Sequence, residues 1–216
     1  MGSVPVALFV NCIFDETKDT LVAPLSLLKV ILSDITYFET RWTNTKSFKW
    51  KLCNKYYTAN IDLVAITSPL MPGDHNPTLN EGLSSRTEAI VFSFESNAPA
   101  SFNLVKHWIP FIERFSPTVR LLVCQNCQDD HFPNRTEVIT WCIENQFELV
   151  ELDDDDVDDD DEKESNIGKL FGSGEFGVPR IVAALQAHMW SNMELIPNQG
   201  QAAGGLKTSE SSSIQL

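Results

Sequence analysis

Apolar residues along the chain fall into two patterns that alternate with each other. Continuous apolar runs of about four to eight residues indicate buried strands, whereas apolar residues about three or four positions apart indicate amphipathic helices. These patterns predict strands at residues 4–11, 47–53, 56–66, 89–94, 119–124 and 147–152. They predict helices at residues 21–32, 79–85, 101–112, 134–145 and 177–190, the fourth of which begins at Asn134 or Thr136.

Residues that favour turns and helix ends mark the borders of these elements. Asn54-Lys55 separates two of the strands, and Asn at a turn position favours a tight hairpin. Ser101 is expected to cap the third helix, and Pro110 is expected to kink it. Pro179 suits the first turn of the last helix. The apolar face of that helix is formed by Val178, Ile181, Val182, Leu185 and Met189.

Strands that alternate with helices predict a mainly parallel sheet with helices on both faces, to which the early hairpin adds one antiparallel pair. The elements follow the order of a small GTPase: a strand, a helix, a hairpin, a helix, and then further strands separated by helices with a closing helix. We therefore expect an α/β, small-GTPase-like (Rossmann-like) domain at residues 1–193. The acidic insertion at about 153–166 and the tail at 194–216 lack apolar periodicity, and we expect both to be disordered.

Length and composition suit one globular domain with a core of ordinary size. The 216 residues are 43% hydrophobic, and no apolar run approaches the roughly 20 residues that span a bilayer. The formal net charge is −14, and most of it comes from residues 151–164, where eleven acids stand against one lysine. Basic clusters are scarce elsewhere, so we expect no nucleic-acid partner and no direct membrane insertion. We interpret the acidic run as a solvated linker, with a site for a basic partner as the alternative.

The first residues and the cysteines both favour the cytosol. The start, MGSVPVALFV, has no basic residue before its apolar stretch, so we expect no secretory signal. The five cysteines are odd in number and scattered, which is typical of free thiols in a reducing compartment. They are Cys12, Cys53, Cys124, Cys127 and Cys142. We therefore expect a cytoplasmic protein.

The motifs that hold a nucleotide in a GTPase are replaced at each predicted position. A phosphate-binding loop needs glycines, a lysine and a Ser or Thr after the first strand. The loop here is Cys12-Ile13-Phe14-Asp15-Glu16, which has no glycine and carries two acids that repel phosphate. Thr67-Ser68-Pro69-Leu70 replaces the Asp-Gly expected after the third strand, and Cys124-Gln125-Asn126-Cys127 replaces the guanine-reading motif. We expect a scaffold without nucleotide, with an atypical GTP- or GDP-binding protein as the alternative.

Two further patterns resemble sites of chemistry. Gly172-Ser173-Gly174-Glu175-Phe176-Gly177 fits G-x-G-x-x-G, but no strand directly precedes it, so we interpret it as a flexible lead-in to the last helix. Cys124-x-x-Cys127 fits half a zinc site or a thiol oxidoreductase, but no second cysteine pair or histidine ligand motif accompanies it. We interpret both cysteines as structural thiols. We therefore expect no enzyme, no cofactor, and no catalytic, cofactor-binding or metal-binding residues.

Three stretches of the sequence resemble one family. They are WKLCNKYYTANIDLVAI at 50–66, TWCIENQFELVEL at 140–152 and GVPRIVAALQAHMWSNM at 177–193, with an acidic loop between the last two. Together they resemble the alpha- and gamma-adaptin-binding protein family. The resemblance implies a non-catalytic pseudo-GTPase domain that binds clathrin adaptor subunits, assists their assembly, and acts in membrane traffic and endocytic receptor recycling.

The resemblance ends near Met193. Members of the family continue through a polar linker into a C-terminal helical segment that mediates self-association and adaptin binding. The tail of this sequence does not resemble that segment, so self-association is doubtful for this chain. The resemblance therefore implies a shortened isoform or a partial gene model that keeps the pseudo-GTPase part.

Overall fold

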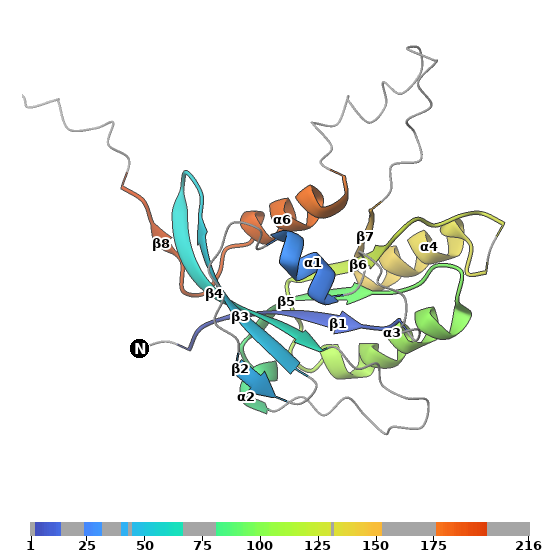
Figure 1. Ribbon diagram of the computed structural model, residues 1–216, viewed down its shortest axis with the longest axis horizontal. Coiled ribbons are helices and arrows are strands. Elements are labelled where there is room, and N and C mark those ends of the chain that lie inside the picture. Colours follow the sequence, from blue (N-terminus) through green and yellow to red (C-terminus); the bar gives the residue numbers. More distant parts are fainter. Residues whose placement is uncertain are drawn as a thin grey trace, which may run out of the picture.

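The computed structural model describes residues 3–13, 24–31, 40–42, 45–66, 81–130, 132–152 and 176–197. Its strands are β1 (Val6–Asn11), β2 (Thr40–Trp42), β3 (Thr45–Cys53), β4 (Tyr57–Ile66), β5 (Thr87–Ser93), β6 (Val119–Cys124), β7 (Glu148–Glu151) and β8 (Glu194–Leu195). Its helices are α1 (Pro24–Ile31), α2 (Glu81–Ser84), α3 (Pro99–Ile112), α4 (Arg135–Asn145) and α6 (Gly177–Ala187). Figure 1 shows the strands at the centre with helices packed on both sides.

The strands form one mixed sheet in which most neighbours run parallel. The order is β2-β3-β4-β1-β5-β6-β7, and β8 pairs with β4 beside this path. The strands β4, β1, β5, β6 and β7 pair in parallel, whereas β3 pairs antiparallel with both β4 and β2. The predicted α/β class, with a mainly parallel sheet and an early hairpin, is therefore confirmed.

Alternate residues of the central strand β1 point into two separate cores. Ala7 and Phe9 join the core that contains residues of α1 and α6, while Val6, Leu8 and Val10 join the core that contains residues of α3 and α4. Every residue of β1 is buried, as expected for a parallel strand covered by helices on both faces. Full burial of a large apolar side chain of this kind contributes about 1.5–3 kcal/mol, so β1 is a main source of stability.

The first residues of α4 and α3 test the capping residues predicted for these two helices. The helix α4 begins after Asn134, whose side chain accepts the Glu137 amide while the Glu137 carboxylate accepts the Asn134 amide, which is a capping box. The expectation that Ser101 caps the third helix is wrong. The helix α3 begins at Pro99, whose missing N–H costs nothing in a first turn, and Ser101 lies fully buried within it. The helix continues past Pro110.

The last helix ends earlier than its apolar pattern predicts. It stops at Ala187, and Met189, which we expected on the buried face, is 73% exposed. The Tyr57 hydroxyl donates to the carbonyls of Gln186 and His188, at 2.8 and 2.7 Å. A further helical turn would need these carbonyls, so a side chain from the sheet provides the partner that ends the helix.

Two short strands and one border differ from the sequence prediction. The strands β2 and β8 were not predicted, because each is too short to give a periodic signal. Since β8 pairs with β4, the tail expected from residue 194 begins with part of the sheet. The rest of the tail and the acidic insertion at 153–166 lie outside the described residues. None of the helices in the described ranges is both long and apolar enough to cross a bilayer.

Candidate functional site

The carboxyl ends of β1, β5, β6 and β7 lie along one edge of the sheet, which we call the carboxyl edge. It comprises residues 11–13, 93–96, 124–127 and 151–152. In open α/β sheets, ligands bind outside this edge, at the point where the strand order reverses. In this sheet the order reverses between β1 and β5, because β4 lies on one side of β1 and the later strands lie on the other. The residues that follow β1 and β5 therefore decide whether a ligand fits at this point.

Hydrogen bonds within the protein occupy the backbone groups that follow β1. The Cys12 amide donates to the Ser93 carbonyl at 2.9 Å, and the Ile13 amide donates to the Asn11 side chain at 3.0 Å. A phosphate-binding loop keeps such amides free to face the phosphate. The first two amides after β1 therefore already have partners inside the protein.

Ser101 closes the carboxyl edge at the point of reversal. Its hydroxyl donates to the Cys12 carbonyl at 2.7 Å and accepts the Glu95 amide at 2.8 Å. This bridge joins the residues after β1 to those after β5, and it satisfies groups that burial would otherwise leave unpaired. The acids expected to repel phosphate, Asp15 and Glu16, lie outside the described residues.

The loop after β6 is also bonded to its surroundings. The Cys127 amide donates to a Glu151 carboxylate oxygen at 2.8 Å, and the Ser96 hydroxyl donates to the Asn126 carbonyl. These bonds hold the loop against the end of β7 and against the residues that follow β5. Thr67-Ser68-Pro69-Leu70 lies outside the part of the chain that the structure describes.

Two thiols and a carboxylate meet where β6 and β7 end. Cys124, Cys127 and Glu151 each place one potential ligand atom within 4.8 Å of the others. The two sulfurs are 3.4 Å apart, and both cysteines are buried. Arg135, in the first turn of α4, donates to the Glu151 carboxylate at 2.7 Å. We name Cys124, Cys127 and Glu151 the thiol–carboxylate cluster. The sequence pattern pointed to the two cysteines but not to Glu151.

The protonation of the thiols argues against a thiol oxidoreductase. A hydrogen bond with Cys127 and burial both raise the pKa of Cys124. Burial likewise raises the pKa of Cys142, in the same core, to about 12. A reactive cysteine needs a lowered pKa, because the thiolate is the nucleophile. Cys124 and Cys142 therefore lack the activation that a redox motif requires.

Backbone geometry explains the last glycine of the G-x-G-x-x-G pattern. Gly177 has φ +62°, in the left-handed region that favours glycine. A Cβ atom there would lie 3.3 Å from the Leu152 carbonyl oxygen. Gly177 thus lets α6 begin close against the end of β7. Gly172 and Gly174 lie outside the described residues, as does the flexible lead-in that we expected there.

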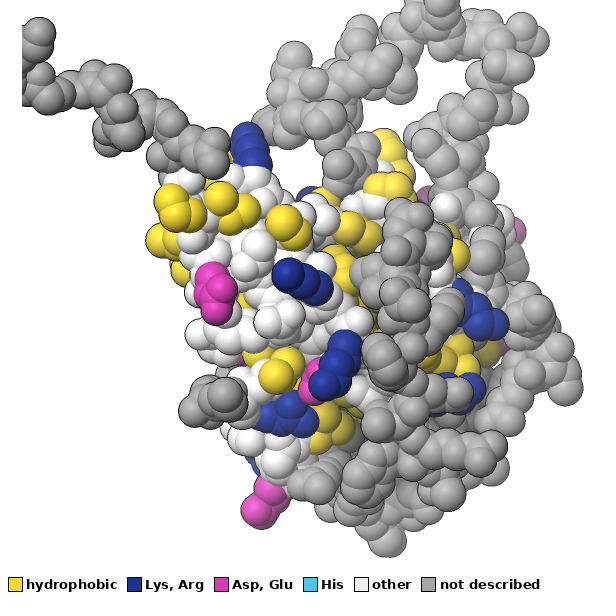
Figure 2. All heavy atoms as spheres, turned by 60° about the vertical axis from the view of Figure 1, so that its left-hand side comes forward, with side chains coloured by type: hydrophobic (Ala, Val, Ile, Leu, Met, Phe, Trp, Pro, Cys, Tyr) yellow, Lys and Arg dark blue, Asp and Glu magenta, His cyan; other side chains and the backbone are white. Residues whose placement is uncertain are grey.

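A different surface forms where the β3–β4 hairpin, β8 and the residues after α6 meet. Its apolar side chains are Tyr56, Met189, Leu195 and Ile196, which are 62%, 73%, 73% and 39% exposed. Figure 2 shows hydrophobic side chains gathered over this part of the molecule. The Lys55 ammonium lies 4.6 Å from the centre of the Tyr56 ring. These five residues are called the hairpin surface, and exposed apolar clusters of this kind mark interaction sites.

Hydrogen bonds fix the hairpin surface to the sheet. The Ile196 amide donates to the Tyr56 carbonyl at 2.8 Å, and the Asn54 side chain accepts the amides of Tyr56 and Tyr57, both at 2.9 Å. Trp190 is 1% exposed, and its indole N–H donates to a carbonyl of α6 at 2.9 Å. The exposed side chains therefore project from a fixed base, which lowers the entropic cost of binding a partner.

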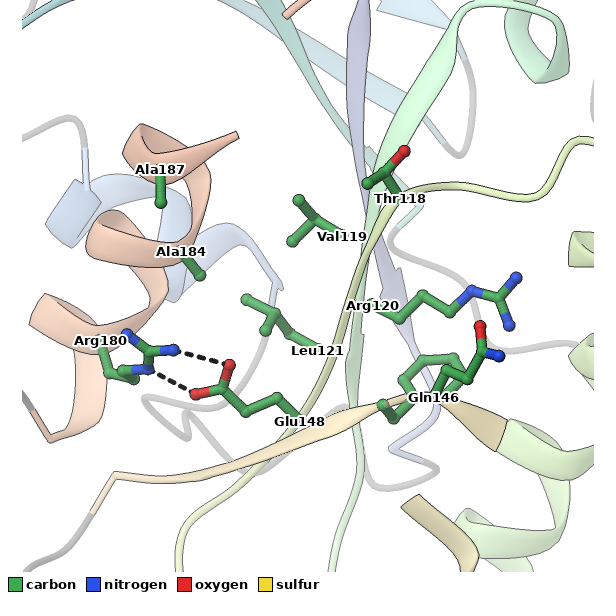
Figure 3. Close-up of a pocket in the computed structure, with 10 residues that line it drawn as sticks. Thr118, Val119, Arg120, Leu121, Gln146, Glu148, Arg180, Ala184 and Ala187 are labelled. Carbon is green, nitrogen blue, oxygen red and sulfur yellow. Dashed lines mark hydrogen bonds and ion pairs between the residues drawn. The ribbon is translucent and has the colours of Figure 1, made fainter. Parts of the chain in front are cut away.

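A hollow of about 380 Å³ lies between α6 and the starts of β6 and β7. In Figure 3, Arg180 and Glu148 are joined by two bonds at one side of it, and Ala184 and Ala187 face it from α6. Arg120 points away from this pair. The side chains of Arg180 and Glu148 are 42% and 40% exposed, so the hollow opens to solvent. It differs in this from the enclosed apolar sites that hold small molecules.

The three stretches that resemble one family meet at α6. Residues 177–193 form this helix and the turn after it. The hydrogen bonds of the Tyr57 hydroxyl join residues 50–66 to its end. The ion pair of α6 with Glu148 joins residues 140–152 to its start. The stretches are far apart in sequence, and they form one packed unit in the fold.

Known proteins that match the chain share one name. The chain is 31% identical over 200 residues to the alpha- and gamma-adaptin-binding protein p34 of Mus musculus. It is 29% identical, again over 200 residues, to the proteins of the same name in Homo sapiens and Pongo abelii. Each match covers 93% of this chain and 57% of the relative, so the chain spans little more than half the length of these curated relatives. The resemblance found in the sequence is confirmed, while no protein-family model matches.

Proposed function

We propose, from its similarity to the alpha- and gamma-adaptin-binding proteins, that this chain is a non-catalytic module that binds clathrin adaptor subunits and assists their assembly. Similarity along 93% of the chain to proteins named for adaptin binding carries this proposal. The same relationship supports a cytosolic protein that acts in membrane traffic and endocytic receptor recycling.

The proposed scaffold is a small-GTPase-like domain that works without a nucleotide. The order of its described elements, with a hairpin after the first strand and helix, supports this reading. The bonded amides after β1 and the Ser101 bridge support the proposal that the scaffold is empty. The domain includes β8, and the acidic insertion interrupts it between β7 and α6.

The hairpin surface suits a protein partner better than the carboxyl edge does. Its apolar side chains are exposed on a fixed base, whereas the Cys12, Ile13 and Glu95 amides of the carboxyl edge already have partners within the protein. Lys55 places a positive charge beside Tyr56, and the exposed Glu194 of β8 places a negative charge beside Leu195. The proposed contact is therefore an apolar segment of an adaptor subunit.

Co-purification of the full chain with separately expressed large and small adaptor subunits tests the function directly. We expect the wild-type chain to retain at least one subunit. A double variant with Met189→Glu and Leu195→Glu should lose it, because a carboxylate at each position would face the partner. Both side chains are 73% exposed, so each change should alter folding stability by less than about 0.5 kcal/mol.

Ile143→Glu is the matched control for the double variant. Ile143 is 74% exposed on α4, so this change places one carboxylate, half the charge added by the double variant, at an exposed apolar residue outside the hairpin surface. We expect the control to bind like the wild-type chain. Failure of the wild-type chain to retain any subunit would sink the proposed function. Equal retention by the wild-type chain and the double variant would reject the hairpin surface as the binding site but would leave the proposed function standing.

Binding of GTP or GDP through an atypical loop predicts a different result. A nucleotide present at about 100 times its Kd would add about 2.7 kcal/mol of stability. We expect no change in melting temperature with either nucleotide and Mg²⁺, because the amides after β1 are bonded within the protein. A rise in melting temperature that depends on the nucleotide would favour the alternative.

A further inference from the structure

We propose that the thiol–carboxylate cluster, Cys124, Cys127 and Glu151, is a binding site for Zn²⁺. It is the one group of three potential ligand side chains in mutual reach within the described ranges. Thiolate sulfur is a soft ligand that favours zinc over the hard cations magnesium and calcium, and a carboxylate completes many zinc sites. This proposal stands apart from adaptor binding, since it rests on different residues.

The spacing of the sulfurs fits a bound metal ion. Two Zn–S bonds of about 2.3 Å at a tetrahedral angle place their sulfurs about 3.8 Å apart. The sulfurs of Cys124 and Cys127 are 3.4 Å apart, so binding would require a shift of only about 0.4 Å. A disulfide needs about 2.05 Å, which would require the sulfurs to approach by more than about 1 Å. The geometry therefore favours a metal ion over a disulfide.

The fold holds the three ligands in place before any ion arrives. Cys124 and Glu151 are register partners at the ends of the paired parallel strands β6 and β7. The loop after β6 brings Cys127 back, and its amide bonds the Glu151 carboxylate at 2.8 Å. Ligands on rigid elements with supporting hydrogen bonds make a preorganised site. An ionised carboxylate accepts at about four positions, and Glu151 already accepts the Cys127 amide and three contacts from Arg135. Zinc would therefore replace one of the two longer contacts from Arg135 Nε, which are 3.3 and 3.5 Å long.

The local charges balance once zinc is bound. Two thiolates and one carboxylate carry three negative charges, and Zn²⁺ together with the guanidinium of Arg135 carries three positive charges. Arg135 contacts the carboxylate at 2.7 Å, so it supports the ligand as an outer partner. The ligands, the ion and Arg135 together need to carry no net charge, because unpaired buried charge is costly. The cluster supplies three protein ligands, and we assign the remaining tetrahedral position to water.

Cobalt and zinc titrations of the full-length chain test the site. Protein freed of metal and kept reduced is titrated with Co²⁺, whose complexes with thiolates absorb in the near ultraviolet and, when tetrahedral, in the visible. We expect both absorptions to saturate at one equivalent of Co²⁺ and to disappear when Zn²⁺ displaces it. Failure of the folded wild-type chain to bind either ion stoichiometrically would overturn the proposal.

Variants separate this site from the other cysteines. Cys127→Ser should abolish the thiolate absorption at one equivalent, whereas Cys53→Ser, at an exposed free cysteine, should leave it unchanged. Arg135→Ala should weaken binding by about 10- to 100-fold, as expected for loss of an outer partner. Circular dichroism checks that each variant is folded.

Three results would contradict the zinc assignment, and the first two apply even if metal binds. Unchanged absorption in folded Cys127→Ser, or its loss in Cys53→Ser, would place the ion elsewhere. The third result is a Cys124–Cys127 disulfide, seen as a mass lower by two hydrogen atoms, in protein that was treated with reductant and still binds no metal.

Discussion

Hydrogen bonds from side chains to the backbone fix both the carboxyl edge and the hairpin surface, but they leave different groups exposed in the two regions. At the carboxyl edge, Ser101 and Asn11 accept the amides of Glu95 and Ile13, which are then no longer free to donate to a ligand. At the hairpin surface, Asn54 and Tyr57 bond backbone groups and leave apolar side chains facing solvent. The comparison teaches that an α/β sheet whose carboxyl-edge amides are bonded within the protein can still expose a fixed apolar surface elsewhere.

Trp190→Ala should have the largest effect, because it removes the base of the hairpin surface. Trp190 is 1% exposed and packs in the core shared by α1 and α6. Loss of a buried tryptophan costs about 3–5 kcal/mol, and the midpoint of urea unfolding measured by circular dichroism should fall accordingly. A loss below about 1 kcal/mol would show that the segment after α6 contributes little to the fold and that the hairpin surface lacks a fixed base.

Ser101→Ala should have the next largest effect, and it should act on stability alone. It leaves the Cys12 carbonyl and the Glu95 amide without their buried partner, which costs about 1–3 kcal/mol. Ser84→Ala, at a half-buried serine whose hydroxyl bonds a carbonyl of its own helix α2, is the control and should change stability by less than about 0.5 kcal/mol. Equal unfolding midpoints for the two variants would contradict the claim that this bridge holds the edge closed.

Tyr57→Phe should have a smaller effect, because it removes one hydroxyl and keeps the ring. The hydroxyl bonds two carbonyls at the end of α6, and its loss should cost about 0.5–1.5 kcal/mol in urea unfolding. Tyr56→Phe, at a ring that is 62% exposed, is the matched control and should be near neutral. If Tyr56→Phe costs as much as Tyr57→Phe, the hydroxyl bonds do not fix the hairpin surface.

The same pair of variants makes a prediction about pH. Burial raises the pKa of Tyr57 in the folded state. A raised folded pKa gives stability that is complete below the unfolded pKa of about 10 and is lost as the pH rises through the folded pKa. Unfolding midpoints above pH 10 should therefore fall less steeply for Tyr57→Phe than for Tyr56→Phe.

The sequence predicted the elements whose signal is local. Each of β1, β5 and β6 contains a continuous run of at least four buried residues, so their positions follow from the pattern alone. The end of α6 did not follow, because the Tyr57 hydroxyl that bonds it lies 129 residues away from Gln186 in the chain. Ser101 was misplaced as a cap for a similar reason, since its partners Cys12 and Glu95 are set by the tertiary fold.

The candidate sites were less predictable than the fold. The missing glycines in the loop after β1 were visible in the sequence, but the bridge that closes the carboxyl edge was not. The neighbours Tyr56 and Tyr57 are 62% and 6% exposed, a difference that two adjacent tyrosines do not reveal in sequence. Glu151 joins Cys127 only through the pairing of β6 with β7, and in sequence it is one acid at the start of an acidic run.

The most direct test of the central claim compares affinities at the two regions. The Kd for the retained adaptor subunit is measured with the wild-type chain, Leu195→Glu and Ser101→Ala, at a temperature where all three are folded. We predict that Leu195→Glu raises Kd at least about tenfold, equivalent to about 1.4 kcal/mol, while Ser101→Ala changes it by less than about twofold. Weaker binding by Ser101→Ala with unchanged binding by Leu195→Glu would contradict the claim and place the partner at the carboxyl edge.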